Sequence, residues 1–562
     1  MNKLYRKITK RQNMKRIVAV VALAMTLTVG LTAKGQDDKG FEISKNLEIF
    51  ANVYKNVHQN YVDDVEPGKL MKTAIDAMLS SLDPYTNYYA ESDMEDVKLQ
   101  LLGEYGGVGA LIHQEGNKIY VAEPYEGLPA DKAGLKAGDR ILEVNGESTD
   151  GKTTADVSGA MRGQAGSSVK LKLERDGKTF EKTLTRQEIK LPNVPYSGMV
   201  TGNVGYIKLD EFTQEAGKNV REAFKRLKTQ NPDMKGVIID LRGNGGGLMA
   251  EAVEIVNIFV KKGELVVETK GKVASKNIRS YTRNAPEDTE IPVAVLIDGY
   301  SASASEIVSG SLQDFDRAVI LGTRSYGKGL VQNILPMAYN TQMKVTVSKY
   351  YIPSGRCIQA IDYSHRDENG RAIRVPDSLK TAFKTRNGRT VYDGFGIEPD
   401  VEVEPEYISQ LSITLVQKFL IFNYVNKFVK EHATIASPSE FEVSDEIYND
   451  FVKWLKDKDY SYTTATERML KDLRDMAKEE SYYEALSKEL DKLEEQLKKD
   501  KADDLTKFKG EISELLKREI LCRYYYQKGR VEGALKNDKE VRKAVEILND
   551  QKTYNELLTK KK

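Results

Sequence analysis

The sequence has few of the residues that build disulfide scaffolds and metal centres. It contains two cysteines, Cys357 and Cys522, which lie far apart and outside any C-x-x-C spacing. A disulfide-dense scaffold, a cysteine zinc cluster and an iron–sulfur site are therefore excluded. The four histidines form no H-E-x-x-H or H-x-H pattern, so we expect no histidine-rich metal site. We also expect the chemistry of the protein to need no metal and no organic cofactor.

An excess of charge of one sign is also absent, because 85 basic residues nearly balance 84 acidic ones. The net charge of +1 gives no reason to expect a nucleic-acid partner. Hydrophobic residues make up 40% of the chain and charged residues 30%, which favours a folded protein of several domains over a disordered chain.

The N-terminus has the pattern of a secretory signal. Residues 1–16 are rich in lysine and arginine, an apolar run follows from Ile17 to Ala33, and we assign residues 1–35 to a signal cleaved near Gly35. An uncleaved membrane-anchoring helix stays open as the alternative, since a run of about 17 residues is at the lower limit for spanning a bilayer. No cysteine lies at the end of this run, which excludes a lipoprotein anchor. In either case we expect the remaining chain in the periplasm, secreted across the inner membrane or anchored to its outer face.

Four further stretches differ in their residue patterns. Residues 36–102 place apolar residues at three- and four-residue spacing, which predicts a helical N-terminal region. Residues 103–190 carry short strands punctuated by glycine, and residues 191–404 alternate near-continuous apolar strands with helices. Residues 405–562 hold three of the 42 glycines, show helical periodicity and contain no chemical motif. We expect these last helices to pack on the core or on a second subunit, so a homo-oligomer stays open.

Three segments rich in small or polar residues follow predicted strands of the α/β region. They are Asp240–Gly247, Gly299–Ile307 and Gly327–Gln332. Open α/β sheets place their sites at the carboxyl ends of strands, so we expect the three segments to meet. A serine in a strand-to-helix turn can expose its hydroxyl there, next to the positive end of the helix dipole.

A serine hydroxyl is a weak nucleophile and needs a base. No histidine lies near these segments in sequence, and Lys328 is the better candidate. Its ordinary pKa of about 10.4 must fall to near 7, which burial can achieve by penalising the charged form. Gln332 shares a face with Lys328 and can hold it without restoring its charge. Serine-rich turns and G-K-G are common, so these residues alone do not distinguish a Ser/Lys pair from ordinary turns.

The glycine-punctuated region resembles a PDZ domain of the circularly permuted type found in bacterial proteases. The similarity lies in Pro129–Leu135, in Gly138–Gly146 and in a carboxylate-binding loop formed by Gly106, Gly107, Val108 and Gly109. Backbone N–H groups of such a loop converge on the terminal carboxylate of a peptide, while the next strand pairs with the peptide. Arg162 matches a position that the family can use to couple peptide binding to assembly of the active site. A solvated surface arginine is the alternative.

The chain resembles the carboxyl-terminal processing peptidases, also called tail-specific proteases, over about residues 45–403. The motifs are S-L-D-P-Y-T from Ser81, D-L-R-G-N-G-G-G from Asp240, S-A-S-A-S from Ser301, G-K-G-L-V-Q from Gly327 and G-I-E-P-D-V from Gly396. This resemblance implies that Ser303 is the nucleophile, Lys328 the general base and Gln332 the third catalytic residue. It also implies an oxyanion hole from the backbone N–H groups of Ala304 and Gly246, and a crotonase/Clp-protease-like core. The family usually has proline where this chain has Gly245, a change that loosens the loop.

We therefore predict a multidomain α/β protein that acts as an extracytoplasmic serine endopeptidase. Its PDZ domain would capture the apolar C-terminus of a protein or peptide, and Ser303 with Lys328 would cleave it. A non-catalytic PDZ scaffold or chaperone that delivers tails to another protease is the alternative. We interpret Ser301 and Ser305 as turn and N-cap hydroxyls, and Asp240 with Arg242 as an ion pair or a support for the glycine loop.

Overall fold

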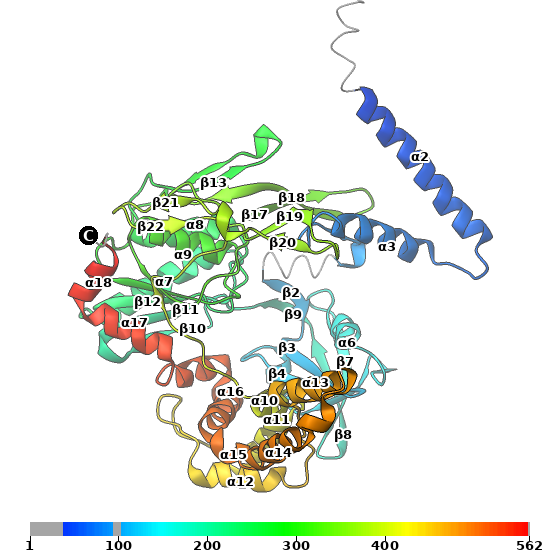
Figure 1. Cartoon of the computed structure of the whole chain (residues 1–562), viewed down its shortest axis with the longest axis vertical. Helices are drawn as coiled ribbons and strands as arrows, with labels where there is room; N and C mark the ends of the chain where they lie inside the picture. The colour runs from blue at the N-terminus through cyan, green and yellow to red at the C-terminus, as the bar shows by residue number, and fades with distance from the viewer. Residues whose placement is uncertain (1–36, 94–102, 560–562) are drawn as a thin grey trace, which may run out of the picture. The chain divides into compact units, whose positions relative to one another are not determined.

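The computed structural model describes residues 37–93 and 103–559 (Figure 1). The predicted signal segment, residues 1–35, lies outside these ranges. The chain divides into two compact units, one up to Ser81 and one from Leu82 onward. Within the described residues, no helix combines the length and the apolar character that a membrane span requires.

The described part of the first unit consists of two helices, α2 (Asp37–Asn60) and α3 (Pro67–Ser80). Proline is favourable at the start of α3, because the N–H that it lacks would have no partner within the helix. The Tyr54 hydroxyl of α2 donates to the Pro67 carbonyl at 2.8 Å and links the helices. Large apolar side chains of α2, among them Phe41 and Leu47, are exposed.

A β domain follows the gap in the described residues. Its main sheet has the order β3-β4-β5-β7-β8, with β6 paired to β5, while β2 pairs with β9. The strands are β2 (Glu104–Gly107), β3 (Ala110–Glu115), β4 (Lys118–Pro124), β5 (Arg140–Val144), β6 (Glu147–Ser148), β7 (Ser168–Arg175), β8 (Lys178–Thr185) and β9 (Gln187–Lys190). Two short helices, α5 (Pro129–Lys132) and α6 (Thr154–Met161), contribute to its apolar core. Val169, Leu171 and Leu173 of β7 are fully buried, so one face of this strand packs in the core.

The central sheet of the α/β region has the order β10-β11-β12-β15-β16-β23. β10 runs antiparallel to β11, and the remaining pairs are parallel. The strands are β10 (Tyr196–Val200), β11 (Val204–Lys208), β12 (Gly236–Asp240), β15 (Val293–Ile297), β16 (Val319–Gly322) and β23 (Val401–Glu402). Every residue of β12, β15 and β16 is buried, as expected for a sheet covered on both faces.

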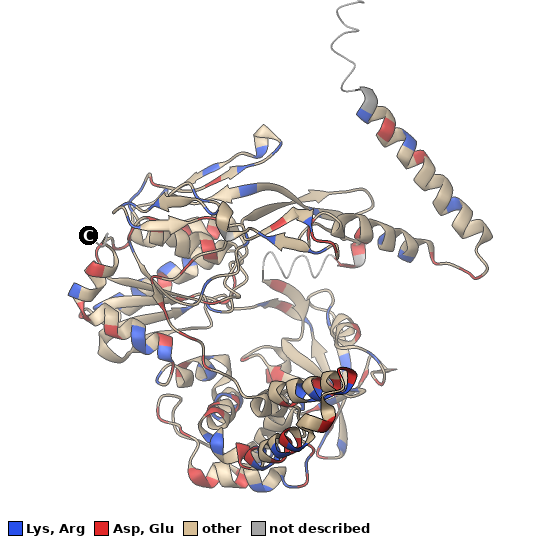
Figure 2. Ribbon diagram, viewed as in Figure 1, with Lys and Arg blue, Asp and Glu red and all other residues tan. Residues whose placement is uncertain are grey.

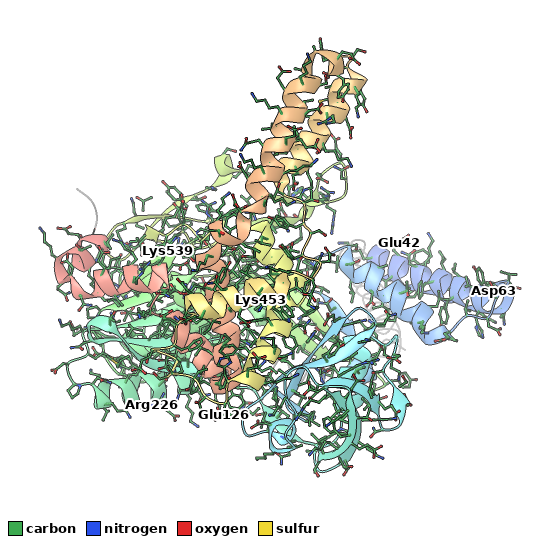
Figure 3. All side chains as sticks on the ribbon, turned by 90° about the horizontal axis from the view of Figure 1, so that it is seen from below. Glu42, Asp63, Glu126, Arg226, Lys453 and Lys539 are labelled. Atoms are coloured by element: carbon green, nitrogen blue, oxygen red, sulfur yellow. The ribbon has the colours of Figure 1, made fainter. Side chains whose placement is uncertain are left out.

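Helices from distant parts of the chain cover the two faces of this sheet (Figure 1). On one face lie α7 (Ala216–Gln230), α8 (Met249–Phe259) and α9 (Ala304–Asp314). The other face is covered by α17 (Lys539–Asn549) and α18 (Gln551–Leu557). Lys539, labelled in Figure 3, is the first residue of α17. The end of the chain therefore supplies a layer of the α/β region.

A second sheet brings an N-terminal segment next to the α/β region. It has the order β1-β18-β13-β14, with β17 also paired to β18. The strands are β1 (Asn87–Tyr89), β13 (Leu265–Lys270), β14 (Arg279–Tyr281), β17 (Leu330–Pro336) and β18 (Gln342–Tyr351). Two small hairpins follow, β19 (Ile361–Arg366) with β20 (Ala372–Arg374) and β21 (Ala382–Lys384) with β22 (Thr390–Tyr392). Because β1 pairs with β18, the turn that precedes β1 lies near the start of β17.

Seven helices lie between the α/β region and α17. They are α10 (Gln410–Gln417), α11 (Leu420–Glu431), α12 (Asp445–Leu455), α13 (Ala465–Glu479), α14 (Tyr483–Ala502), α15 (Asp504–Lys507) and α16 (Lys509–Ala534). Figure 2 shows acidic and basic residues interspersed along α13 and α14. Arg474 of α13 pairs with Asp491 and Glu494 of α14, each at 2.8 Å.

These helices also contact the β domain. The His113 ring of β3 stacks on the Phe419 ring, with 4.3 Å between the ring centroids. The Tyr526 hydroxyl of α16 donates to Asp131 at 3.0 Å, at a point where α16 is kinked and Tyr526 has a φ of 55°. The β domain is thus joined to the C-terminal helices by aromatic and polar contacts.

Candidate active site

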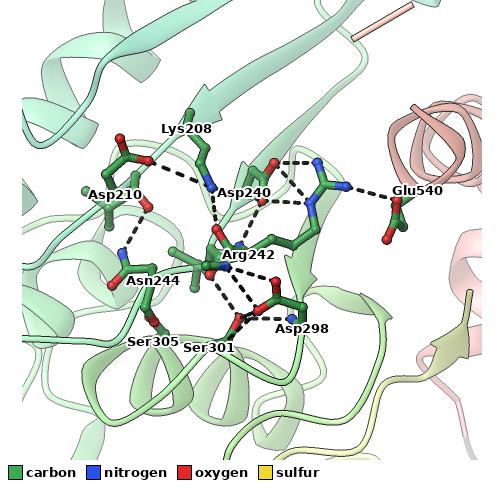
Figure 4. Close-up of polar contacts among 12 residues, drawn as sticks. Lys208, Asp210, Asp240, Arg242, Asn244, Asp298, Ser301, Ser305 and Glu540 are labelled. Carbon is green, nitrogen blue, oxygen red and sulfur yellow. Dashed lines mark hydrogen bonds and ion pairs between the residues drawn. The ribbon is translucent and has the colours of Figure 1, made fainter. Parts of the chain in front are cut away.

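The three predicted segments meet at the carboxyl ends of β12, β15 and β16. Two serines join the first segment to the second: the Ser301 hydroxyl donates to the Leu241 carbonyl and the Ser305 hydroxyl to the Asn244 carbonyl, each at 2.9 Å (Figure 4). The Gly243 N–H donates to the Asp298 carboxylate at 3.0 Å. Ser301 and Ser305 are therefore structural, but they hold two loops together, and the residue at the N-cap of α9 is Ser303.

Ser303 lies in a strained conformation against a glycine. Its φ of 56° and ψ of −110° are unfavourable for any residue other than glycine. Gly246 approaches so closely that a Cβ there would lie 2.8 Å from the Ser303 Cβ and 2.9 Å from the Ala304 nitrogen. Only glycine fits at position 246, and its φ of 100° requires glycine as well.

Glu306 connects the Ser303 turn to the loop that carries Lys328. Its buried carboxylate accepts the backbone N–H of Ser303 at 2.8 Å, of Gly327 at 2.7 Å and of Lys328 at 2.9 Å. The Ser325 hydroxyl donates to the same carboxylate. Burial raises the pKa of Glu306, although all four hydrogen bonds favour its charged form. The sequence interpretation missed this residue, yet a serine followed three positions later by glutamate at a helix start is a recognisable capping pattern.

The pKa of Lys328 is lowered in the direction that the sequence argument required, although not as far as 7. Burial, together with the nearby charge of Lys344, lowers the pKa of Lys328 to about 8. Its ammonium lies over the Tyr85 ring, 4.2 Å from the centroid. Among the described residues, no hydrogen bond joins this ammonium to the Ser303 hydroxyl. The two residues are thus held in neighbouring loops, but the lysine faces an aromatic ring from the N-terminal part of the chain.

Gln332 likewise faces a residue other than Lys328. Its amide donates to the Thr346 hydroxyl of β18 at 3.1 Å. The backbone N–H of Thr346 donates in turn to the Thr86 hydroxyl at 3.2 Å. Asp83 fixes this turn, because its carboxylate accepts the backbone N–H of Tyr85 and of Thr86, each at 2.8 Å. The turn Asp83–Thr86 therefore reaches both Lys328, through Tyr85, and Gln332, through Thr346.

The two predicted oxyanion donors differ in their surroundings. Ala304 is the first residue of α9, where the helix dipole favours negative charge. The Gly246 N–H instead donates to the Asn244 side chain within its own loop, at 2.8 Å. In this arrangement Gly246 lies beside Ser303 while its N–H is already satisfied.

Asp240 and Arg242 form the predicted ion pair at the start of the same loop, with 2.6 Å between the Arg242 Nη2 and the Asp240 Oδ2 (Figure 4). Burial by itself would raise the pKa of Asp240, but the charges of Arg242 and Lys208 hold it well below its usual range. The Lys208 ammonium also donates to the Arg242 carbonyl. Asp240 and Arg242 are thus fixed by several charged contacts.

A separate groove lies in the β domain, with a cavity volume of about 320 Å³. It is lined by residues of β3, by α6 and by Gly107, Val108 and Gly109. Gly106 belongs to β2 and is not among the lining residues, because its backbone is packed against the Gly163 carbonyl. Arg162 lines the groove, and its guanidinium lies over the Tyr105 ring at 5.2 Å from the centroid. An exposed strand edge beside a glycine loop suits a peptide that pairs as an added strand.

Within residues 37–93 and 103–559, no group of three or more His, Cys, Asp or Glu side chains is arranged to hold a metal ion. Cys357 and Cys522 both have free thiols.

Four family models match parts of the chain. Residues 203–367 match peptidase family S41 and residues 120–175 match a PDZ domain. Residues 22–93 match the N-terminal domain of the activating protease CtpB. Residues 411–548 match the C-terminal helical domain of a probable PDZ-protease. The matches cover both helical ends of the chain as well as its two central regions.

Individual relatives cover more than half of the chain. A carboxy-terminal-processing protease of Bartonella bacilliformis is 38% identical over 321 residues, which is 56% of this chain and 73% of that protein. A probable CtpA-like serine protease of Staphylococcus aureus is 32% identical over 314 residues, covering 56% of this chain and 62% of that protein. Among solved structures, a photosystem II D1 C-terminal processing protease is 27% identical and covers 64% of this chain and 93% of that chain, with a TM-score of 0.34.

Proposed function

The chain belongs to the carboxyl-terminal processing serine proteases of peptidase family S41, and we propose that Ser303 and Lys328 perform its peptide-bond hydrolysis. The observation that carries this proposal is the Glu306 carboxylate, which ties the strained Ser303 turn to the loop of Lys328. A pKa of about 8 for Lys328 leaves an appreciable neutral fraction near neutral pH.

In the proposed reaction, neutral Lys328 takes the hydroxyl proton of Ser303 as the serine oxygen bonds to the substrate carbonyl carbon. The backbone N–H groups of Ala304 and Gly246 stabilise the oxyanion. The protonated lysine then gives its proton to the leaving amine as the C–N bond breaks, and water hydrolyses the acyl-enzyme with Lys328 again as the base. Gln332 orients the lysine without charging it.

This reaction requires the resting contacts to change. The Lys328 ammonium must leave the Tyr85 ring and approach the Ser303 hydroxyl. The Gln332 amide must turn from Thr346, and the Gly246 N–H must release Asn244. We propose that substrate binding brings about these changes, so that the protein rests in an inactive arrangement.

The PDZ domain is proposed to select the substrate. The groove along β3 and α6 would take an extended apolar C-terminus, with the terminal carboxylate at Gly107, Val108 and Gly109. Arg162, at the edge of this groove, is proposed to couple occupancy to the active site. The finer fold assignments, a circularly permuted PDZ domain and a crotonase/Clp-protease-like core, belong to the same proposal.

We also propose that the protein works in the periplasm. The support is the basic and apolar pattern of residues 1–35, either cleaved as a secretory signal or kept as an anchor on the outer face of the inner membrane. Self-association through the C-terminal helices remains a proposal, with the exposed apolar side chains Met469 and Leu473 of α13 in its support.

The proposal is tested by comparing the purified protein with its Ser303→Ala and Lys328→Ala variants. Each is incubated with a partly unfolded protein that ends in small apolar residues, and the fragments are mapped by mass spectrometry. We expect cleavage by the wild type alone, lost when the substrate tail is amidated. Equal cleavage by all three proteins would refute the Ser/Lys assignment, and tail binding without cleavage would favour a scaffold that delivers tails to another protease.

A further inference from the structure

We infer that Asp538 and Glu540, at the start of α17, are positioning residues for the reaction. They hold Arg242 and, through it, the glycine loop Gly243–Gly247 beside Ser303. This inference rests on the proposed function, because it assigns the loop to stabilisation of the oxyanion. It gives the C-terminal helices a part in catalysis, although their sequence contains no chemical motif.

Three carboxylates surround the Arg242 guanidinium. Its Nη1 donates to Asp538 at 3.1 Å and to Glu540 at 2.9 Å, and its Nη2 lies 2.9 Å from the second oxygen of Asp538. The Arg242–Glu540 contact is drawn in Figure 4 beside the Arg242–Asp240 pair. The side chains of Arg242, Asp538 and Glu540 are 17–20% exposed, so water screens these charges only in part.

Arg242 is the anchor that immediately precedes a loop with little rigidity of its own. Four of the five residues from 243 to 247 are glycines, which lose more conformational entropy on ordering than other residues. Asn244 provides one internal support, since its side chain donates to the Leu209 carbonyl at 2.9 Å. Asp298 and Ser305 hold the loop from the neighbouring segment. A further support enters through Arg242, whose N–H donates to Asp240 and whose carbonyl accepts from Lys208. Fixing the guanidinium therefore fixes the point from which the loop departs.

The start of α17, which carries both acids, is itself held firmly. Asp538 caps α17 by accepting the Val541 N–H at 2.9 Å. On the same helix, Val541, Ala544 and Ile547 are buried against residues of the central sheet. The Asp538 carboxylate therefore bonds both to the start of a well-packed helix and to Arg242. This arrangement transmits the position of α17 to the loop.

Charge also favours this role. Without the acids of α17, the two cations Arg242 and Lys208 would share Asp240 as their buried anion. The arginine could then turn toward other carboxylates or toward water, and the loop start would move with it. Asp538 and Glu540 remove that freedom by occupying the outer side of the guanidinium.

The test uses the full chain with Asp538→Asn and Glu540→Gln combined. Asparagine caps helices as well as aspartate does, so α17 keeps its cap. The two negative charges that face Arg242 are lost. The matched control combines Asp550→Asn, at the N-cap of α18, with Glu546→Gln, on the exposed side of α17. Cleavage kinetics are measured on a peptide with an apolar C-terminus, together with inhibition by the corresponding peptide aldehyde, whose adduct with Ser303 carries an oxyanion.

We expect kcat to fall roughly tenfold or more in the Asp538/Glu540 variant, less than the 10²–10³-fold that follows removal of an oxyanion donor. KM should stay within about twofold, and aldehyde inhibition should weaken by the same factor as kcat, since the oxyanion forms only after binding. The control should match the wild type. In an Arg242→Gln background, the additional Asp538 and Glu540 changes should have no further effect on kcat, because the hydrogen bonds that link the two acids to the loop, within the described part of the chain, run through this arginine.

Amide hydrogen exchange separates this inference from the proposed function. We expect the amides of residues 243–247 to exchange faster in the Asp538/Glu540 variant than in the control, whether or not turnover is seen. Three results would each overturn the inference. They are a wild-type kcat in the Asp538/Glu540 variant, unchanged amide exchange at residues 243–247, or an equal loss of kcat when the two acids are changed in the Arg242→Gln background. Faster loop exchange in a protein whose wild type shows no Ser303-dependent cleavage would overturn the proposed function instead.

Discussion

Glu306 accepts the backbone N–H of Lys328 at 2.9 Å while it also accepts the N–H of Ser303 at 2.8 Å. One buried side chain therefore sets the distance between the two loops that carry the proposed nucleophile and the proposed base. Four donors point at this carboxylate, and three of them are backbone N–H groups, which cannot accept a hydrogen bond from a replacement side chain.

We predict that Glu306→Gln destabilises the fold and reduces activity together. The glutamine NH₂ would face N–H donors, leaving buried groups without partners at a cost of about 1–3 kcal/mol. Denaturant unfolding measures the stability, and cleavage of a tail peptide measures the activity. The exposed Glu556→Gln serves as the control, and a Glu306 variant as stable and active as this control would contradict the structural role.

The pH dependence of cleavage should report the pKa of Lys328. Only the neutral lysine can take the serine proton, and its pKa is lowered to about 8. The kcat/KM should therefore rise as the pH increases through about 8 and level off above it.

Lys344→Gln should move this profile. The positive charge of Lys344 helps to lower the pKa of Lys328. Replacing Lys344 by glutamine should therefore raise the pKa of Lys328 and shift the rise in kcat/KM to higher pH. Lys349→Gln, an exposed position on the same strand, is the matched control. A profile that does not respond to Lys344→Gln would argue that another group titrates.

Gly246→Ala and Gly245→Ala form a matched pair in one loop. A Cβ at position 246 would lie 2.7 Å from the Ala302 carbonyl oxygen and 2.8 Å from the Ser303 Cβ, whereas a Cβ at 245 meets nothing within 4 Å. We expect Gly246→Ala to lower kcat about 10²-fold or more and Gly245→Ala to stay within a few-fold of wild type. Similar kinetics for both would mean that the loop does not need its close approach to Ser303.

Ser158→Trp should block the PDZ groove. Ser158 of α6 lines the cavity, so a tryptophan there would occupy the space of a peptide side chain. We expect the KM for tail-bearing substrates to rise on the order of tenfold, which corresponds to about 1.4 kcal/mol of binding free energy. Ala160→Trp, on an exposed position of the same helix, should leave KM unchanged. Equal KM values for both variants would place tail recognition elsewhere.

Local patterns predicted much of the fold and the neighbourhood of the candidate site. Continuous apolar runs identified β12 and β15, and the small residues after each strand placed Ser303 and Lys328 at one edge of the sheet. The contacts that hold these residues come from far along the chain, where periodicity carries no information. Tyr85 meets Lys328 from the turn before β1, and Asp538 meets Arg242 from α17. The Asn244 bond that occupies the Gly246 N–H depends on side-chain geometry that a glycine-rich motif leaves open.

The placement of α17 and α18 also determines when the enzyme can be complete. Ribosomes make the chain from its N-terminus, so Tyr206, Ile238 and Leu296 have no cover on one face until the last two helices have been synthesised. Only then can the Tyr554 hydroxyl of α18 accept the Val293 N–H at the start of β15, at 3.0 Å. A nascent or truncated chain that contains Ser303 and Lys328 but not α17 and α18 therefore leaves one face of the central sheet uncovered, and its proteolytic activity can mature only after these two helices have been made.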